Sequence, residues 1–170
     1  AADQFGEVWF LPLADAEGAV AAKGSVLIAG APTTTGVVSL YIAGQLVSLT
    51  VATGETPADI ATALAKLINV SGNLPVTAVA TAATVALTAK NKGIAGNEID
   101  LRLNYRGTPS GEAVPAGLQL TLTALTGGAT NPVLDTALAS LGDEPFDFIV
   151  CPYTDTASLD ALKALLNDKT

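Results

Sequence analysis

Histidine is absent from this chain of 170 residues, which narrows the chemistry that the chain can perform. Histidine is the usual general base at neutral pH and the commonest metal ligand in proteins. A nucleophilic serine or cysteine would therefore have no histidine to activate it. We predict that the chain is not an enzyme and that it has no catalytic, cofactor-binding or metal-binding residue.

Cysteine and basic residues are also scarce. Cys151 is the one cysteine, so no disulfide can form within the chain and the fold does not depend on an oxidising compartment. Eight Lys and Arg residues stand against sixteen Asp and Glu residues, and the formal net charge is -8. Proteins bind a polyanion by neutralising its phosphates with basic side chains, so we expect no nucleic-acid partner.

Long apolar runs are missing, although hydrophobic residues make up 49% of the chain. Residues 24–54 contain no charged residue, but Gly30, Pro32, Gly36 and Gly44 divide them into pieces of strand length. A helix that spans a membrane needs about 20 continuous apolar residues, so we predict no membrane span. The opening AADQFGEVWF also lacks the basic start and apolar core of a secretory signal.

Short segments of alternating apolar and polar residues follow one another through residues 24–129 and predict a β-rich domain. The alternation is strictest in Ile99–Tyr105, so one face of that strand is expected to meet the core. Ala43-Gly44-Gln45 is expected to form the turn of a β-hairpin. The predicted strands are Ser25–Ala29, Val38–Ile42, Val47–Val51, Val76–Ala80, Thr84–Ala89, Ile99–Tyr105 and Leu118–Leu125.

One helix is predicted inside this domain. It starts at Thr56-Pro57-Ala58-Asp59, because Thr56 can cap the helix, proline suits the first helical position and Asp59 can reach back. Its apolar stripe consists of Ile60, Leu64, Leu67 and Ile68, and Ser71-Gly72 ends it. The sequence therefore predicts an α+β domain in which one helix packs on an antiparallel sheet.

The stretch LTAKNKGIAGNEIDLRLNY, Leu87–Tyr105, places a basic glycine loop between two predicted strands. Lys90, Lys92 and Gly93–Gly96 could be read as a G-x-x-G clamp for nucleic acid or as a phosphate loop. The clamp joins two helices in RNA-binding modules, however, and the P-loop pattern G-x-x-x-x-G-K-[ST] does not occur. We interpret the stretch as a β-hairpin that fixes the core of the domain.

Residues 1–23 and 130–170 show a different pattern. Glu7–Leu11 (EVWFL) and Phe146–Cys151 (FDFIVC) are nearly continuous apolar runs, which are typical of parallel strands covered on both faces. Two amphipathic helices are expected, one from Asn131-Pro132 with Leu134, Ala137, Leu138 and Leu141, and one from Thr154 or Asp155 with Leu159, Leu162, Leu165 and Leu166 facing inward. We interpret residues 1–23 and 130–170 as two parts of an α/β domain with a parallel sheet, residues 24–129 as a domain inserted between them, and the chain as a fragment.

Two candidate chemical groups lie in the last part. Cys151 would sit at the carboxyl end of a parallel strand, where α/β sheets place their sites, but a buried structural cysteine is the simpler interpretation. The acidic residues there could surround a cation, although their spacing matches no known loop pattern and caps or turns are the default interpretation. These residues are Asp143, Glu144, Asp147, Asp155 and Asp160.

Three stretches resemble the contractile-tail sheath proteins of Mu-like bacteriophages. Pro145–Leu166 (PFDFIVCPYTDTASLDALKALL) is similar to the conserved core of that family, Leu87–Tyr105 to its strand-loop-strand signature, and Phe5–Asp15 to the segment before the inserted unit. The terminal arms that link neighbouring subunits of the family are not among these residues. We therefore expect a central fragment of a longer sheath subunit.

This resemblance implies a structural protein of the virion that is made in the host cytoplasm. Many copies would assemble with one another into rings or a helical sheath around the tail tube, above a baseplate, and contract to drive the tube through the host envelope. Assembly would belong to the segments around Trp9 and Phe146–Leu166, and the fragment alone could be monomeric. The core of the family has been likened to a subtilisin-type fold, but likeness of fold does not carry activity.

Two other functions remain open on the sequence alone. A β-rich surface-binding or adhesin module could use polar threonine faces and the loop Gly107–Gly117. A hydrolase would have to rely on Cys151 or on the acidic residues near Asp147.

Overall fold

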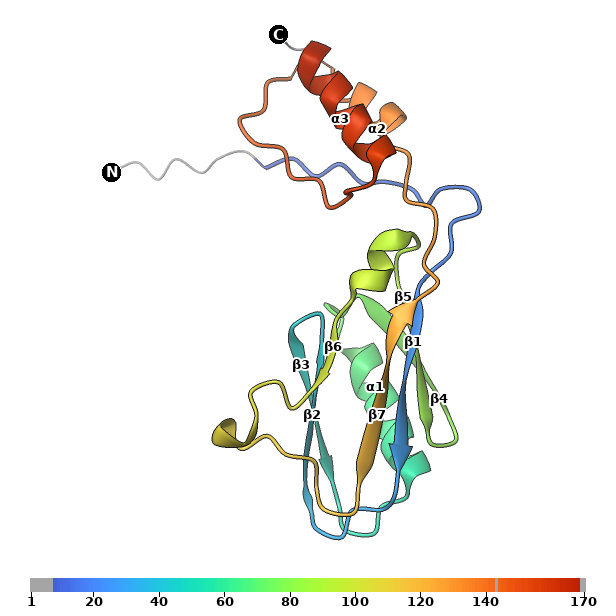
Figure 1. The fold of residues 1–170 in the computed structure, drawn as a ribbon, viewed down its shortest axis with the longest axis vertical. Coiled ribbons are helices and arrows are strands. Elements are labelled where there is room, and N and C mark those ends of the chain that lie inside the picture. The colour runs from blue at the N-terminus through green and yellow to red at the C-terminus, as the bar shows by residue number, and fades with distance from the viewer. Residues whose placement is uncertain (1–7, 143, 169–170) are drawn as a thin grey trace, which may run out of the picture.

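The computed structural model describes residues 8–142 and 144–168, and its elements confirm the predicted α+β class. Figure 1 shows a long β-rich unit and, at one end of it, a smaller unit that contains α2 and α3. The elements are β1 Lys23–Ala29, β2 Gly36–Ile42, β3 Gln45–Val51, α1 Pro57–Val70, β4 Val76–Thr81, β5 Thr84–Ala89, the 3-10 helix η1 Ile94–Glu98, β6 Leu101–Leu103, the 3-10 helix η2 Thr108–Ser110, β7 Gln119–Thr126, α2 Asp135–Ala139 and α3 Thr156–Asp168.

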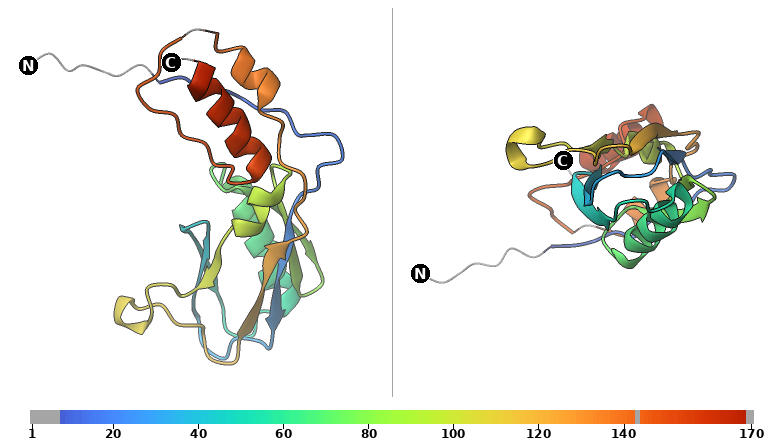
Figure 2. Two further views of the ribbon diagram at one scale, coloured as in Figure 1. Left: turned by 45° about the horizontal axis from the view of Figure 1, so that its top comes forward. Right: turned by 90° about the horizontal axis from the view of Figure 1, so that it is seen from below.

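The strands form two antiparallel sheets, whereas the sequence suggested a single sheet. One sheet has the order β4-β5-β1-β7 and the other the order β3-β2-β6. Both sheets and α1 contribute to one hydrophobic core, and the views in Figure 2 show the helix lying beside the strands. The largest fully buried side chains of this core are Val26, Ile28, Val38, Leu40, Ile42, Val51, Ile60, Leu64, Ile68, Leu74, Leu87 and Leu125.

Helix α1 begins and ends as predicted. The Asp59 amide donates to Thr56 Oγ1 (3.2 Å), so Thr56 caps the helix, and the Thr56 hydroxyl donates to Asp59 Oδ2 (2.6 Å), which holds the capping side chain in place. The Ser71 amide and hydroxyl both donate to the Leu67 carbonyl at the other end. The buried stripe then packs α1 on β1, β3, β4 and β5.

The predicted hairpin is also confirmed. Strands β2 and β3 pair from Gly36 opposite Val51 to Ile42 opposite Gln45. Ala43 and Gly44 both have positive φ, 49° and 76°, which is the backbone of a type I′ turn and matches the twist of the paired strands. Strand β2 is the middle strand of its sheet, and its side chains are buried from Val38 onward; on one face Tyr41 is covered by Tyr105 and Glu112.

The stretch Leu87–Tyr105 is not the hairpin that its alternation predicted. Strand β5 pairs with β4 and β1, whereas β6 pairs with β2, so the chain crosses from one sheet to the other between them. Residues Ile94–Glu98 form η1, and β6 has only three residues because Asn104 adopts a positive φ of 51°. The side chain of Tyr105 is consequently 62% exposed instead of buried.

The prediction of two parallel strands outside the β-rich unit, Glu7–Leu11 and Phe146–Cys151, is also wrong. Residues 8–11 and 146–151 run without strand structure, and Glu7 lies outside the described residues. A strand requires hydrogen bonds to a neighbour, and the pairs in the sheets of the described residues are all antiparallel: β1 with β5 and β7, β2 with β3 and β6, and β4 with β5. The two segments do meet, because the rings of Trp9 and Phe146 pack edge to face with centroids 5.8 Å apart.

A second, smaller hydrophobic cluster joins α2 and α3. Leu134, Leu138 and Ala161 are buried in it, and Leu11, Leu13, Leu141, Cys151, Tyr153, Leu162 and Leu165 pack around them. α3 starts directly after Asp155, as predicted, but α2 starts at Asp135 and not at Asn131-Pro132. Leu159 and Leu166, expected to face inward, are 50% and 56% exposed. The described residues thus hold two separate clusters, although Ala22 belongs to the core of the β-rich unit and β1 begins at Lys23. The division into residues 24–129 and the flanking residues 1–23 and 130–170, hereafter the flanking unit, stays a prediction.

Substitution of Leu64 tests the core of the β-rich unit. Its side chain is fully buried (0% exposed), and Leu64→Ala should lower the free energy of unfolding by about 2–5 kcal/mol because the surrounding atoms cannot close the cavity. Val70→Ala in the same helix, where the side chain is 74% exposed, should change it by less than about 0.5 kcal/mol. Urea unfolding of both variants measures the difference, and equal effects would contradict this packing.

Candidate functional site

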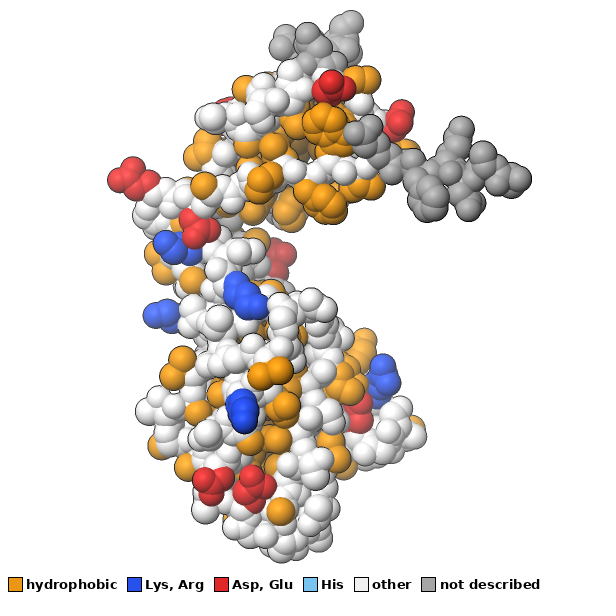
Figure 3. Space-filling view, turned by 180° about the vertical axis from the view of Figure 1, so that it is seen from behind, with side chains coloured by type: hydrophobic (Ala, Val, Ile, Leu, Met, Phe, Trp, Pro, Cys, Tyr) orange, Lys and Arg blue, Asp and Glu red, His pale blue; other side chains and the backbone are white. Residues whose placement is uncertain are grey.

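Several large apolar side chains of the flanking unit are exposed to solvent. Phe10, Phe148 and Val150 are 90%, 92% and 93% exposed, and Val8 and Trp9 are more than half exposed. Figure 3 shows hydrophobic side chains gathered on the smaller unit. We call Val8, Trp9, Phe10, Phe148 and Val150 the apolar flank. Such exposure of aromatic and branched residues is typical of a surface that another protein segment covers.

The flanking unit also carries the whole net charge of the chain. Residues 24–129 contain five acidic and five basic residues, whereas residues 1–23 and 130–170 contain eleven acidic and three basic residues. The β-rich unit is therefore neutral, and the flanking unit combines an apolar surface with strong negative charge. A partner of this unit must offer apolar contacts and must not be acidic.

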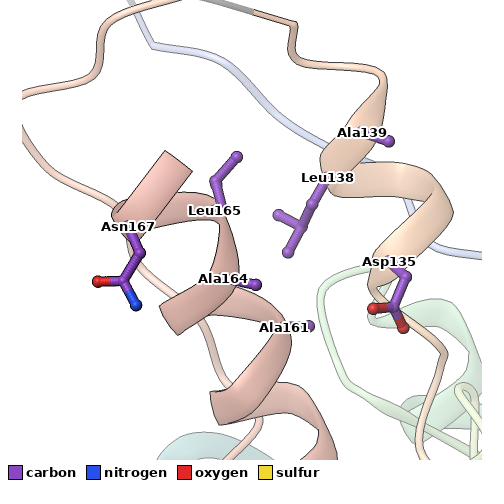
Figure 4. A pocket seen from close by; sticks show the side chains of 7 residues that line it. All are labelled: Asp135, Leu138, Ala139, Ala161, Ala164, Leu165 and Asn167. Atoms are coloured by element: carbon purple, nitrogen blue, oxygen red, sulfur yellow. The ribbon is translucent and has the colours of Figure 1, made fainter. Parts of the chain in front are cut away.

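A groove of about 450 Å³ lies between α2 and α3. Figure 4 shows Leu138 of α2 pointing toward α3, where Ala161, Ala164 and Leu165 line the opposite side. The alanine side chains are too small to fill the space between the two helices. Asp135 and Asn167 supply the polar groups along the groove, so it has no cluster of titratable residues that could carry out chemistry.

The connections between the two units lie side by side. Val20 and Ala129 exchange both backbone hydrogen bonds, 3.0 and 3.1 Å, in an isolated antiparallel bridge that we call the neck. Asn97 of η1 clasps the neck, because its Oδ1 accepts from the Gly128 amide (2.7 Å) and its Nδ2 donates to the Gly128 carbonyl (3.0 Å). A Cβ on residue 128 would lie 2.4 Å from the Gly93 carbonyl oxygen, so only glycine fits there.

The basic glycine loop serves this junction. The Gly93 amide donates to the Val20 carbonyl (3.1 Å), and Gly96 packs so closely on Ala22 and Ala89 that a Cβ would lie 3.0 and 3.2 Å from their methyl groups. Lys90 Nζ donates to the Gly72 carbonyl (3.1 Å), and Lys92 Nζ lies 3.9 Å from Asp15 Oδ2. Both lysines thus contact their own chain, and the glycines allow close backbone packing.

Asn131 connects the loop to α3. Its Oδ1 accepts from the Ile94 amide (2.8 Å), and its Nδ2 donates to Asp155 Oδ2 (2.7 Å). The Asp155 carboxylate in turn accepts from the Ser158 amide (3.0 Å) and the Ser158 hydroxyl (2.9 Å), which caps α3. The Asn131 amide, followed by these two Ser158 donors, holds the pKa of the Asp155 carboxyl below its usual value.

The cysteine and the other acidic residues are not assembled into a site. Cys151 is half-buried, and its Sγ lies 3.7 Å from the Tyr153 carbonyl oxygen in a segment without strand structure. Burial, then the nearby Cys151 and Asp15, raise the pKa of the Tyr153 hydroxyl. Asp147 and Asp160 are exposed, and Asp143 lies outside the described residues. Across the described ranges, no three Asp, Glu or Cys side chains are grouped closely enough to hold a metal ion.

The helices of residues 8–142 and 144–168 include none long and apolar enough to cross a membrane. Sequence reasoning overlooked the roles of Asn97 and Gly128, and it assigned Asn131 to a helix cap. The Asn-Pro dipeptide did suggest a cap, but the partners of Asn131 lie 37 and 24 residues away in sequence. Only the sequence around Gly93–Asn97 and Gly127-Gly128, two glycine-containing turns, hinted at a close approach.

Acid should lower the free energy of unfolding of the chain by protonating Asp155. Its folded pKa lies below that of the unfolded chain, about 3.9, so its stabilising contribution is complete above that pH and is lost as the pH falls through the folded pKa. Asp155→Asn removes this titration, so the difference in unfolding free energy between wild type and variant should shrink below about pH 4. Urea unfolding at several pH values measures it. Asp160→Asn, an equal charge change on the exposed side of α3, should keep the acid dependence of the wild type.

Comparison with known proteins also relates the chain to phage tail sheaths. No family model matches the chain. The chain is 44% identical over 158 residues to the Mu-like prophage FluMu tail sheath protein of Haemophilus influenzae. The aligned region covers 93% of this chain and 32% of that protein, so the chain spans about a third of the length of this relative. This similarity confirms the predicted resemblance of the chain to the tail sheath proteins of Mu-like bacteriophages.

Proposed function

We propose that this chain is part of a structural subunit of a contractile phage tail sheath. The subunit assembles with copies of itself around a tail tube, stands on a baseplate, and contracts to drive the tube through the host envelope. The proposal rests on the apolar flank of a chain that is 44% identical to a sheath protein. Each of the five residues of the apolar flank is more than half exposed. Its place is the virion, after synthesis in the host cytoplasm.

The charge distribution supports a contact between different surfaces. Two flanking units meeting through the same face would bring two strongly acidic surfaces together, which costs free energy at close range. A contact between different surfaces avoids this repulsion. When such a contact repeats without closing, it builds a helical filament, which is the geometry of a sheath.

The residues support a structural role over catalysis. The chain contains no histidine, so Cys151 has no histidine base, and within residues 8–142 and 144–168 no three Asp, Glu or Cys side chains are grouped closely enough to hold a metal ion. The net charge of -8 works against a nucleic-acid partner. We propose that the β-rich unit, which is neutral and has its own core, projects from the assembled flanking units.

The loop after β6 favours a second candidate, a surface-binding module. It projects from the β3-β2-β6 sheet in Figure 1, and Glu112 holds it by accepting from the Tyr41 hydroxyl and the Arg106 amide. Tyr105 lies beside it, with the Arg102 guanidinium 5.1 Å from its ring centroid. Binding of the chain to a glycan array that Tyr105→Ala abolishes would support this candidate, and we expect no such binding.

Substitutions in the apolar flank test the proposed assembly. In the full-length protein, the double variant Phe148→Asp, Val150→Asp should lose about 3–6 kcal/mol per contact, which is at least a hundredfold in the association constant. We expect tubes or rings of the wild type in negative-stain electron microscopy. The double variant should sediment as free subunits.

The matched control is Val79→Asp on β4, where the side chain is 64% exposed on the β-rich unit. This variant should form the same tubes as the wild type. A wild-type protein that never forms tubes or rings would refute the sheath proposal. Tubes formed by the double variant would instead show that the apolar flank is not a subunit contact.

A further inference from the structure

The neck alone is a weak connection between the two units. It consists of one antiparallel bridge, Val20 opposite Ala129, in which only two backbone hydrogen bonds join the chains. A single bridge resists bending poorly, and the hydrogen bonds that reinforce it, from Asn97 to Gly128 and from Gly93 to Val20, do not reach α2 or α3. The orientation of the flanking unit on the β-rich unit must therefore depend on contacts beside the neck.

Apolar packing does not supply enough of these contacts on the α3 side. A cavity of about 240 Å³ lies between the two units at this place. It is lined by Ile94, Asn131, Pro132, Val133, Leu134, Asp135, Asp155, Ala157 and Ser158. A space of this size has room for water, so the facing atoms do not pack directly against one another and polar contacts hold more of the orientation.

Asn131 makes a polar contact to each unit. Its Oδ1 accepts from the Ile94 amide of η1, which belongs to the β-rich unit, and its Nδ2 donates to Asp155, the cap of α3. Ser158, which is 3% exposed, fixes the carboxylate with two further hydrogen bonds. The amide is thus held at both ends by groups that are themselves held in place.

The backbone leaves room for this amide. Gly93 has a φ of +116°, and a Cβ built there would lie 2.9 Å from Asn131 Oδ1. A larger residue at position 93 would displace the side chain. The second side-chain contact between the units, from Asp15 to Lys92, is longer, at 3.4 and 3.9 Å, and both side chains are more than two-fifths exposed. It contributes less to the orientation than Asn131 does.

We propose that Asn131 is a coupling residue that locks the β-rich unit to the start of α3, so that the two units move as one rigid body. The Ile94–Asn131–Asp155–Ser158 chain of hydrogen bonds, which we call the clasp, crosses the junction beside the neck. A force applied to the flanking unit then moves the β-rich unit with it. This coupling goes beyond the sheath proposal and stands whether or not the chain assembles.

Distances between spin labels on the two units test the coupling in the chain of 170 residues. The labels are placed with Ser48→Cys on β3 and Lys163→Cys on α3, both exposed positions, in a Cys151→Ser background. Double electron-electron resonance should give one narrow distance distribution with Asn131 present. Asn131→Ala should broaden it at least twofold, because only the neck and the Lys92 contact then remain.

The chain offers a matched control in Asn69. Its amide makes the same two-way link, to the Ala78 amide (2.9 Å) and carbonyl (2.7 Å), but within the β-rich unit. Asn69→Ala should therefore lower the stability of that unit and leave the distance distribution narrow. If Asn131→Ala fails to fold, as judged by circular dichroism, Asp155→Ala replaces it. Because that variant also removes the cap of α3, it is compared with Ser158→Ala, which weakens the cap and keeps the Asn131–Asp155 hydrogen bond, and only broadening beyond that of Ser158→Ala counts.

The outcomes separate cleanly. Broadening by Asn131→Ala or by Asp155→Ala, with no broadening by Asn69→Ala, supports the coupling. A distribution that is already broad with Asn131 present overturns it, and so does one that stays narrow after the clasp is removed. Equal broadening by Asn69→Ala and Asn131→Ala also overturns it, because general loosening would then explain both results.

Discussion

The closure of η1 on the neck is the constraint on which the rest of the structure depends. After β5 the chain has to leave one sheet and enter the other, and η1 makes that crossing. Asn97 anchors the crossing by pairing with both backbone groups of Gly128. Because Gly128 lies two residues after the end of β7, the same contact ties the exit of the β-rich unit to η1, and the absence of a side chain there makes the approach possible.

The two units solve the problem of burial differently. The β-rich unit encloses its own core between two sheets and α1, and its acidic and basic residues balance. The flanking unit buries only a small cluster around Leu138 and leaves aromatic side chains such as Phe148 in the open. The β-rich unit therefore buries most of its large apolar side chains, whereas the flanking unit leaves several of them exposed. This difference fits a fold in which projection and assembly are assigned to separate parts of the chain.

Local patterns predicted the elements whose causes are local. The cap at Thr56, the stripe of α1 and the turn at Ala43-Gly44 depend on residues a few positions apart, and all are present as expected. The stretch Leu87–Tyr105 misled because alternation indicates an extended segment without naming its neighbour. Strand β6 pairs with β2, which lies some 60 residues earlier in the sequence, and the turn at Asn104 shortens it. Apolar runs such as EVWFL and FDFIVC failed for a related reason, since a strand forms only where another strand meets its hydrogen-bonding groups.

Composition and local pattern alone determined the α+β class, the position of α1, the resemblance to sheath proteins and the lack of groups for histidine-based catalysis. Only the tertiary structure decided that there are two sheets, that Asn131 bridges Ile94 and Asp155 instead of capping a helix, and that the basic glycine loop is a structural joint. The physical reason is the range of the interactions. Helix caps and turns act over a few residues, whereas sheet pairing and the hydrogen bonds of the junction join residues tens of positions apart, which no local pattern encodes.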